Sequence, residues 1–321
     1  MLIALLSLFI IFGIIRLIIS AVREFMAWLG RGKTVHELAE NSSGLIEEEY
    51  AEDIRLYVQA LDEQRSLKHL GKEIAGEAPR LTAEQRRALR RASFKARREY
   101  LDYIKLGWFQ IVVIFLVASV LGLIIEEIWM FITEGLTQSR VGLVWGPYSP
   151  IYGFGAVLLT IVCWKLRERG AKAWQIFVVG MIVGGLLEQI TGWGMETFLG
   201  AVSWDYTGVP GALTKWVAWP FLFFWGGLGL VWSKAIMPEL LYHIGNPTTV
   251  RQVVFVSLLA IYLAADIGMT VMCFGRMAAR DAGIAPSNSF EEWVDENYTD
   301  EFIAARFENM AIDGATGRQA E

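Results

Sequence analysis

The sequence predicts an all-α polytopic membrane protein, a transmembrane helical bundle with a charged cytoplasmic helical insert. Hydrophobic residues make up 54% of the 321 residues and charged residues 20%, whereas soluble domains carry about 25% charged residues. The mean hydropathy is +0.39, and 13 tryptophans fit the aromatic belts of membrane interfaces. The net charge of −5 gives no basic excess, so we expect no nucleic-acid partner.

Six stretches approach the roughly 20 apolar residues that a spanning helix needs. They are Leu2–Val22, Trp108–Ile132, Ile151–Leu166, Gln175–Leu199, Trp216–Ile236 and Val253–Phe274. The first has Arg16 as its only charge and no small-residue cleavage site after it, so we interpret it as a retained anchor.

The spans divide the chain into four segments. We expect an N-terminal anchor (1–22), a charged helical insert (23–106), a five-span core (107–276) and an acidic tail (277–321). Within the insert, Thr82 and Gln85 have the spacing of a capping box, which predicts a helix beginning there. We interpret the insert as a solvated helical spacer, with a binding module as the alternative.

Basic loops predict the orientation, because Lys and Arg gather on the cytoplasmic side. The insert and the loop after the third span are both rich in these residues, and the tail is acidic. We therefore expect a multi-pass protein of the plasma (inner) membrane, with the insert cytoplasmic and the N-terminus and tail extracytoplasmic. The loops Thr133–Pro150 and Gly200–Lys215 would then face outward.

Carboxylates inside spans cost about 2.5–3.5 kcal/mol each to insert and are functional hypotheses by default. Glu126 and Glu127 lie in the second span, Glu188 and Glu196 in the fourth, and Asp266 in the sixth. The structural alternative is that these groups lock helices together. Since a buried charge persists only when paired, we expect Arg140 and Lys215 to neutralise Glu126, Glu196 or Asp205.

The outer segments hold two unusual stretches. Trp145–Gly155 mixes prolines, glycines and aromatics, including Tyr148 and Tyr152, and we expect it to fold into the membrane face, where irregular backbone often lines a site. In Ser203–Thr207, Asp205 stands between Trp204 and Tyr206. It could contact a headgroup or cation, or cap a turn in an interfacial anchor.

These observations predict a substrate or ion site and no catalytic motif. Its candidate residues are Glu126, Arg140, Tyr148, Tyr152, Glu188, Glu196, Asp205 and Lys215. The chain has no Walker A, GxSxG or HExxH sequence, and its three histidines have no ligand spacing for zinc. We expect Cys163 and Cys273 to be buried apolar residues. The sequence indicates no cofactor.

The motif order resembles the putative ABC-transporter type IV family over about Gly122 to Pro238. The series is Gly122-x3-Glu126, Arg140, a GP-x-x-PIYGFG string from Gly146, then Glu188, Glu196, Trp204-Asp205-Tyr206 and Trp225-Gly226. Where family members place an Asn-Gly-Arg turn, this chain has Ala212–Trp216. The resemblance implies a permease, which would need a separate ATPase or other protein subunit.

Three functions stay open on the sequence. The leading one is a transporter or permease-like protein whose carboxylates line an outward-facing polar cavity. The second is a membrane-embedded enzyme acting on a lipid or envelope precursor, with paired carboxylates in acid–base or cation-holding roles. The third is a non-catalytic scaffold or assembly factor, whose tail would bind partners or pack on the bundle. Membrane lipids are expected contacts, and a homo-oligomer is compatible with the sequence.

Overall fold

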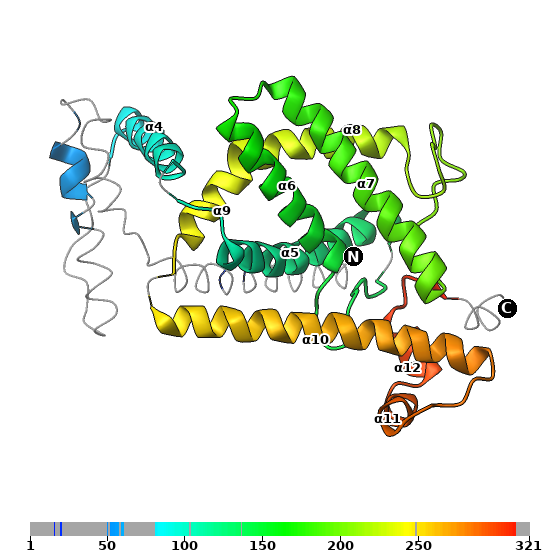
Figure 1. Ribbon diagram of the computed structural model, residues 1–321. Helices are drawn as coiled ribbons and strands as arrows, with labels where there is room; N and C mark the ends of the chain where they lie inside the picture. Colours follow the sequence, from blue (N-terminus) through cyan, green and yellow to red (C-terminus); the bar gives the residue numbers. More distant parts are fainter. Residues whose placement is uncertain are drawn as a thin grey trace, which may run out of the picture. The chain divides into compact units, whose positions relative to one another are not determined.

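A computed structural model describes residues 16, 20, 50, 52–57, 59–60, 81–102, 104–135, 137–247 and 249–312. The chain divides into two compact units, Met1–Gln110 with Pro238–Gln252 and Ile111–Met237 with Val253–Glu321. The described residues are mostly helical, which confirms the predicted fold class. Figure 1 labels the helices in chain order.

Five helices in the described part of the chain are long and apolar enough to cross a membrane. Four of them are α5 (Trp108–Glu134), α6 (Pro150–Glu168), α7 (Ala173–Leu199) and α10 (Val250–Asp281). Their bounds agree with the predicted spans, except that α10 extends several residues further at its C-terminal end. The predicted first span, Leu2–Val22, lies almost wholly outside the described residues.

The remaining span joins three elements into one helical stretch, Trp219–Ile244. It consists of α8 (Trp219–Val231), a π-helical turn η1 (Trp232–Ile236) and α9 (Met237–Ile244). The prediction of Trp216–Ile236 was displaced, because residues before Trp219 belong to a turn and the helix continues past Ile236. At η1, Trp232 Nε1 donates to Thr160 Oγ1 of α6 at 3.0 Å, so the irregular turn is tied to a neighbouring span.

Lipid contact follows from the side chains that these helices leave exposed. Large apolar residues are exposed on each of the five spans, as expected where hydrocarbon replaces water. Examples are Ile125, Trp129, Phe154, Ile182, Leu186, Ile190, Phe224 and Leu258.

Glycines bring α7 and α8 into close backbone contact. A Cβ added at Gly180 would lie 2.8 Å from the backbone oxygen of Trp225, and one added at Gly184 would lie 1.9 Å from Cγ of Trp225. Small residues permit such approach between membrane helices. The sequence prediction that the Gly180-x3-Gly184 and Gly226-Gly227-x-Gly229 patterns serve packing is therefore confirmed.

The first unit contains α4 (Ala83–Tyr100), and its predicted capping box is present. Thr82 N donates to Gln85 Oε1 at 2.9 Å, and Gln85 N donates to Thr82 Oγ1 at 3.2 Å. One face of α4 packs through Ala92 against the buried Ile54. The predicted helix of the insert thus begins where the sequence indicated.

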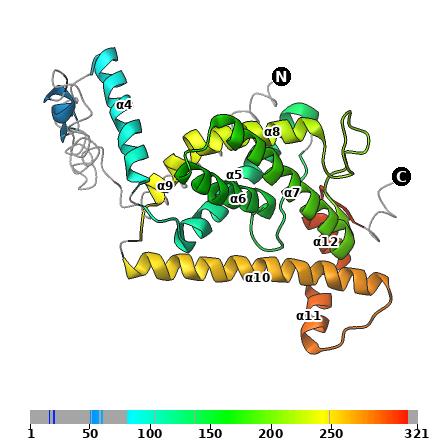
Figure 2. The same cartoon turned by 45° about the horizontal axis from the view of Figure 1, so that its top comes forward.

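The tail folds onto one end of the second unit. It contains α11 (Ser289–Asn297), α12 (Asp300–Arg306) and a two-residue strand β2 (Ala311–Ile312), which pairs antiparallel with β1 (Ala201–Val202). Both views place α11 and α12 beside the C-terminal half of α10 (Figures 1 and 2). The strands are a small addition to an otherwise helical fold.

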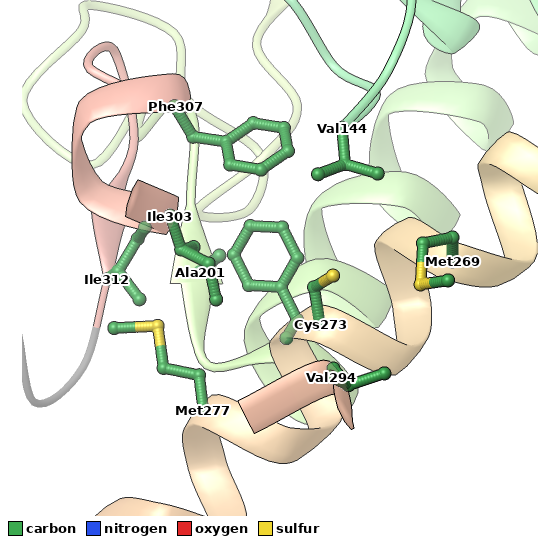
Figure 3. Packing of buried hydrophobic residues seen from close by; sticks show 10 residues of the cluster. Val144, Ala201, Met269, Cys273, Met277, Val294, Ile303, Phe307 and Ile312 are labelled. Carbon is green, nitrogen blue, oxygen red and sulfur yellow. The ribbon is translucent and has the colours of Figure 1, made fainter. Parts of the chain in front are cut away.

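An apolar cluster holds the tail in place (Figure 3). It joins Val294, Ile303 and Phe307 of the tail region to Phe274 and Cys273 of α10. The Phe274 and Phe307 rings lie 4.9 Å apart between centroids. Of the tail aromatics expected to pack on the bundle or the membrane face, Phe307 packs in this cluster, whereas Trp293 and Phe302 are exposed.

Ion pairs reinforce this docking at the C-terminal end of α10. Arg276 binds Asp295 at 2.6 Å and Glu291 at 3.3 Å, and Arg280 contacts Asp295 and binds Asp300 at 2.5 Å. The hydrogen bonds from Arg276 lower the pKa of Asp295, while the N–H and hydroxyl of Ser287 lower the pKa of Glu291. Acidic residues of the tail thus meet basic residues of the last span.

Candidate functional site

Glu126 lies in the C-terminal half of α5, at the centre of an ion-paired group. Its Oε1 lies 2.8 Å from the Arg140 guanidinium, and its Oε2 accepts a hydrogen bond from the Tyr152 hydroxyl at 2.7 Å. The side chains of Arg140 and Glu126 are 12% and 24% exposed. A half-buried carboxylate therefore keeps its charge because a cation and a hydroxyl both bind it.

Gly122 explains how Tyr152 reaches Glu126 from a different helix. A Cβ at Gly122 would lie 2.3 Å from Cγ of Tyr152, so the tyrosine ring crosses α5 where the side chain is missing. Glu126 stands one helical turn further along, at the i+4 position. The Gly122-x3-Glu126 spacing thus positions a hydroxyl donor against a carboxylate.

Glu188 of α7 is a second intramembrane carboxylate, and it is only 7% exposed. Its Oε1 accepts a hydrogen bond from Trp225 Nε1 at 2.9 Å. Its Oε2 is buried and has no hydrogen-bond partner in the described part of the chain. Burying a polar atom without a partner is costly, so this oxygen stands out as a free acceptor.

Tyr206, on the loop after α7, is influenced by the charges of both carboxylates. Its ring stacks on Phe221, with centroids 4.3 Å apart and planes at 9°, and its N–H donates to the Lys215 carbonyl at 2.7 Å. Burial raises the pKa of Tyr206, and the charges of Glu188 and Glu126 raise it further. The tyrosine is therefore within electrostatic range of both. We call Glu126, Arg140, Tyr152, Glu188, Tyr206 and Trp225 the polar centre.

Glu196 of α7 and Lys215 of the loop before α8 form a separate pair. Lys215 Nζ lies 2.7 Å from Glu196 Oε1, with both side chains about one-third exposed. The pair joins the C-terminal end of α7 to the segment that leads into α8. The predicted neutralisation of intramembrane carboxylates by Arg140 and Lys215 is therefore observed, each cation with a different glutamate.

Asp266 of α10 holds the irregular loop before α6. The carboxylate is fully buried, and its two oxygens accept hydrogen bonds from Trp145 N and Gly146 N, both at 3.0 Å. Thr270 Oγ1, one turn away, accepts from Val144 N at 3.0 Å. Three successive backbone N–H groups of the loop are thus satisfied by one face of α10, as irregular backbone at membrane depth requires.

Arg306 of α12 binds the carbonyl side of the same loop. Its Nη2 donates to Leu143 O at 3.1 Å and to Gly146 O at 2.8 Å. The loop that carries Arg140 toward Glu126 is therefore held by α10 on its N–H groups and by the tail on its carbonyls. These contacts hold the loop against α10 and α12, and the expected folding of Trp145–Gly155 into the membrane face stays a prediction.

Two predicted site residues lie away from the polar centre. Tyr148 packs with its ring edge toward Tyr262, with centroids 6.4 Å apart, and burial, then the charges of Tyr262 and Asp266, raises its pKa. Asp205 is exposed and accepts hydrogen bonds from Thr207 N at 2.8 Å and Thr207 Oγ1 at 2.5 Å, which lower its pKa. Its contacts are those of a residue that caps a turn.

Sequence reasoning missed several residues of this arrangement. Tyr206 and Trp225 belong to the motifs that carried the family resemblance, and their place beside intramembrane carboxylates was the available signal. Arg306 carried no such sequence signal, because a lone arginine in an acidic tail does not indicate which backbone carbonyls it binds. Asp266 was identified as a costly intramembrane charge, but its loop partners could not be derived.

Both cysteines are free and buried, as the sequence predicted. Within the residues that the structure describes, no group of three or more His, Cys, Asp or Glu side chains could hold a metal ion. No curated protein and no solved structure matches the chain.

A family model does match residues 113–271, a segment that begins in α5 and ends in α10. This segment contains Glu126, Arg140, Tyr152, Glu188, Tyr206 and Trp225, and it includes the whole motif series from Gly122 onward. With five candidate spans, the match supports a multi-pass, transporter-like membrane protein. Over these residues the chain is similar to the family described as putative ABC-transporter type IV, as its motifs predicted.

Proposed function

We propose that the protein is a permease-like transporter of the plasma membrane and that its polar centre is an outward-facing substrate site. One observation carries the proposal: Glu188 is buried in a span, with one oxygen bound by Trp225 and the other without a partner among the described residues. A buried carboxylate oxygen that serves structure alone is expected to be hydrogen-bonded. A free acceptor at this place fits a donor group on a bound molecule.

The neighbouring groups supply complementary chemistry. Arg140 binds Glu126 through one nitrogen, while its buried Nε has no partner in the described part of the chain. Among the described residues, the polar centre therefore offers a free acceptor on Glu188 of α7 and a free donor on Arg140 of the loop before α6. Such a pair favours a small polar molecule that carries a donor and an acceptor of its own.

The loops that contribute to the polar centre indicate to which side of the membrane the site would open. The loop before α6 supplies Arg140, and the loop after α7 supplies Tyr206 and Lys215. The positive-inside rule predicts that both loops lie outside the membrane. Transport driven by ATP would need a separate ATPase subunit, because this sequence contains no Walker A motif.

Native mass spectrometry of the full chain in nanodiscs tests the proposal. We expect a small polar molecule to remain on the wild-type protein, and its bound fraction to fall about tenfold in Glu188→Gln, because a lost hydrogen bond to a charged group costs about 1.5–3 kcal/mol. Glu168→Gln is the matched control. Glu168 is an exposed residue at the C-terminal end of α6, and this variant should retain the molecule.

The other outcomes decide between the alternatives. Equal binding by wild type, Glu188→Gln and Glu126→Gln, or no bound molecule in any of them, would contradict a substrate site in the polar centre. A retained lipid that the protein modifies would favour the envelope enzyme. A co-purifying protein without a small molecule would favour the scaffold.

A further inference from the structure

The amphipathic helix α4 has one strongly basic face that nothing in the proposed transport site uses. The helix carries seven Lys or Arg residues and two Glu residues, a net charge of +5 over Ala83–Tyr100. Arg86, Arg87, Arg90 and Arg91 are exposed and line an open hollow of about 510 Å³ with Ala83. At about 100° per residue, these four arginines cover an arc of about 140°.

The two faces of α4 differ sharply in their surroundings. The opposite face packs through Ala92, which is 1% exposed, against Ile54, and Ala88 and Leu89 join the same cluster. That packing fixes which side of the helix points away from its own unit. The basic face is therefore the side that the insert presents outward.

The four arginines form no ion pairs among the described residues. No ion pair joins Arg86, Arg87, Arg90 or Arg91 to another residue in the part of the chain that the structure describes. Arg86 with Arg90 and Arg87 with Arg91 are like charges at the i, i+4 spacing, which destabilises an isolated helix. An anionic partner would relieve this repulsion.

A large aromatic side chain lies in the middle of the basic face. Phe94 is 51% exposed, and the Arg98 guanidinium lies 6.0 Å from its ring centroid. The phenyl ring can enter the headgroup region when the arginines around it meet an anionic membrane surface.

Contacts within the first unit place one end of α4 at the ends of membrane helices. The rings of Tyr100 and Tyr242 of α9 lie 5.4 Å apart between centroids. Gln110, near the start of α5, donates to Gly245 O at 2.8 Å, just after α9 ends. The C-terminal end of α4 is therefore anchored where α5 enters and α9 leaves the bilayer.

From these observations we propose that α4 lies along the membrane surface, with its basic face bound to anionic phospholipid headgroups. Basic segments next to a span are attracted to an anionic membrane surface. The helix is about 27 Å long. If it stood upright, Ala83 would lie about 25 Å from its anchored end, whereas a helix lying on the surface keeps Ala83 among the headgroups.

The position of Ala83 in nanodiscs provides the test. The full chain with Ala83→Cys is labelled with a bimane fluorophore, since the native Cys163 and Cys273 are buried. The nanodiscs contain phosphatidylcholine alone or 3:1 phosphatidylcholine to phosphatidylglycerol, with a nitroxide-headgroup lipid as quencher. We expect at least twofold stronger quenching in the anionic discs and its loss when Arg86, Arg87, Arg90 and Arg91 are all replaced by Gln.

Controls separate charge from folding and from other ligands. The same four positions replaced by Lys should keep the quenching, as should Glu84→Gln with Glu99→Gln on the same helix. Gln and Arg have similar helix propensity, and circular dichroism checks that α4 persists. Equal quenching in the two disc types, or in the Gln variant and wild type, would overturn the proposal. Inorganic phosphate that abolishes quenching more than sodium chloride of equal ionic strength would assign the face to a free phosphate ligand instead.

Discussion

At the scale of single residues, Glu126 shows how the chain keeps a charge inside a span. Two donors from other segments reach it: the Arg140 guanidinium at 2.8 Å and the Tyr152 hydroxyl at 2.7 Å. Neither donor is on α5, so the carboxylate joins the outer loop and α6 to that helix. Removing one partner leaves a partly buried charge unpaired, which is more costly than removing both.

Arg140→Gln is therefore expected to destabilise the protein by about 3 kcal/mol, the usual cost of breaking a buried pair from one side. Adding Glu126→Gln should restore part of that loss, because the double variant no longer buries an unpaired carboxylate. Chemical denaturation of the wild type, the two single variants and the double variant in one detergent measures the coupling energy between Arg140 and Glu126. Purely additive losses would show that the two side chains do not interact in solution.

The sequence predicted the charged residues of the site but only part of their partners. Glu126, Glu188, Arg140 and Lys215 could be identified because charges in or beside spans are rare and costly. Which cation meets which carboxylate depends on the path of the loops, and this path depends on contacts with Asp266 and Arg306. Such long-range contacts leave no periodic pattern in the sequence.

At the scale of elements, the packing of α7 on α8 positions Glu188. Gly184 leaves space for the Trp225 ring, with only 1.9 Å between its hypothetical Cβ and Cγ of Trp225. The same ring donates its Nε1 hydrogen to Glu188. Helix packing and the geometry of the polar centre therefore depend on one aromatic side chain.

Gly184→Ala should displace Trp225 and cost about 1–3 kcal/mol, as overpacking of a filled interface does. Gly194→Ala is the matched control on the same helix, because no atom lies within 4 Å of its hypothetical Cβ, and it should be neutral or slightly stabilising. Thermal unfolding in detergent compares the two variants. Equal unfolding temperatures would contradict the close approach of α7 and α8.

The docked tail is a second element whose stability depends on pH. The Arg276 hydrogen bonds hold the pKa of Asp295 below its ordinary 3.8, and the Ser287 groups lower the pKa of Glu291 from 4.5. A carboxyl whose pKa is lower in the folded state stabilises that state fully above its ordinary pKa. This contribution is lost as the pH falls through the lowered value.

We therefore expect α11 to stay docked between pH 7 and about pH 5 and to loosen below about pH 4. Hydrogen exchange of residues 289–306, corrected for the intrinsic pH dependence of exchange, measures the docking. Asp295→Asn should loosen α11 at neutral pH, whereas Glu296→Gln, an exposed neighbour, should not. Unchanged protection in Asp295→Asn would show that the apolar cluster alone holds the tail.

At the scale of the whole molecule, the length of the apolar stretches was the strongest sequence signal for the fold. Four of the five described spans agree with the predicted ones because about 20 apolar residues have few alternatives to crossing a bilayer. The fifth, Trp219–Ile244, is displaced from the predicted Trp216–Ile236, because its helix begins only at Trp219 and continues through η1 and Pro238. The sequence indicated only that the apolar residues of the tail should be buried somewhere. It did not indicate that β2 pairs with β1.

The contacts at one end of the second unit also support a common side for the outer loops and the tail. Arg306 binds the loop before α6, and β2 pairs with β1 after α7. These three segments must therefore share one side of the membrane. The central claim is that this side is extracytoplasmic and that the polar centre opens to it.

Thiol labelling in intact cells tests this claim most directly. Gly208→Cys lies two residues after Tyr206, in open space, and Glu168→Cys lies at the opposite end of α6; Cys163 and Cys273 are buried. A membrane-impermeant maleimide is predicted to label Gly208→Cys in intact cells and Glu168→Cys only after permeabilisation. Labelling of Glu168→Cys in intact cells, with Gly208→Cys protected until permeabilisation, would contradict the account.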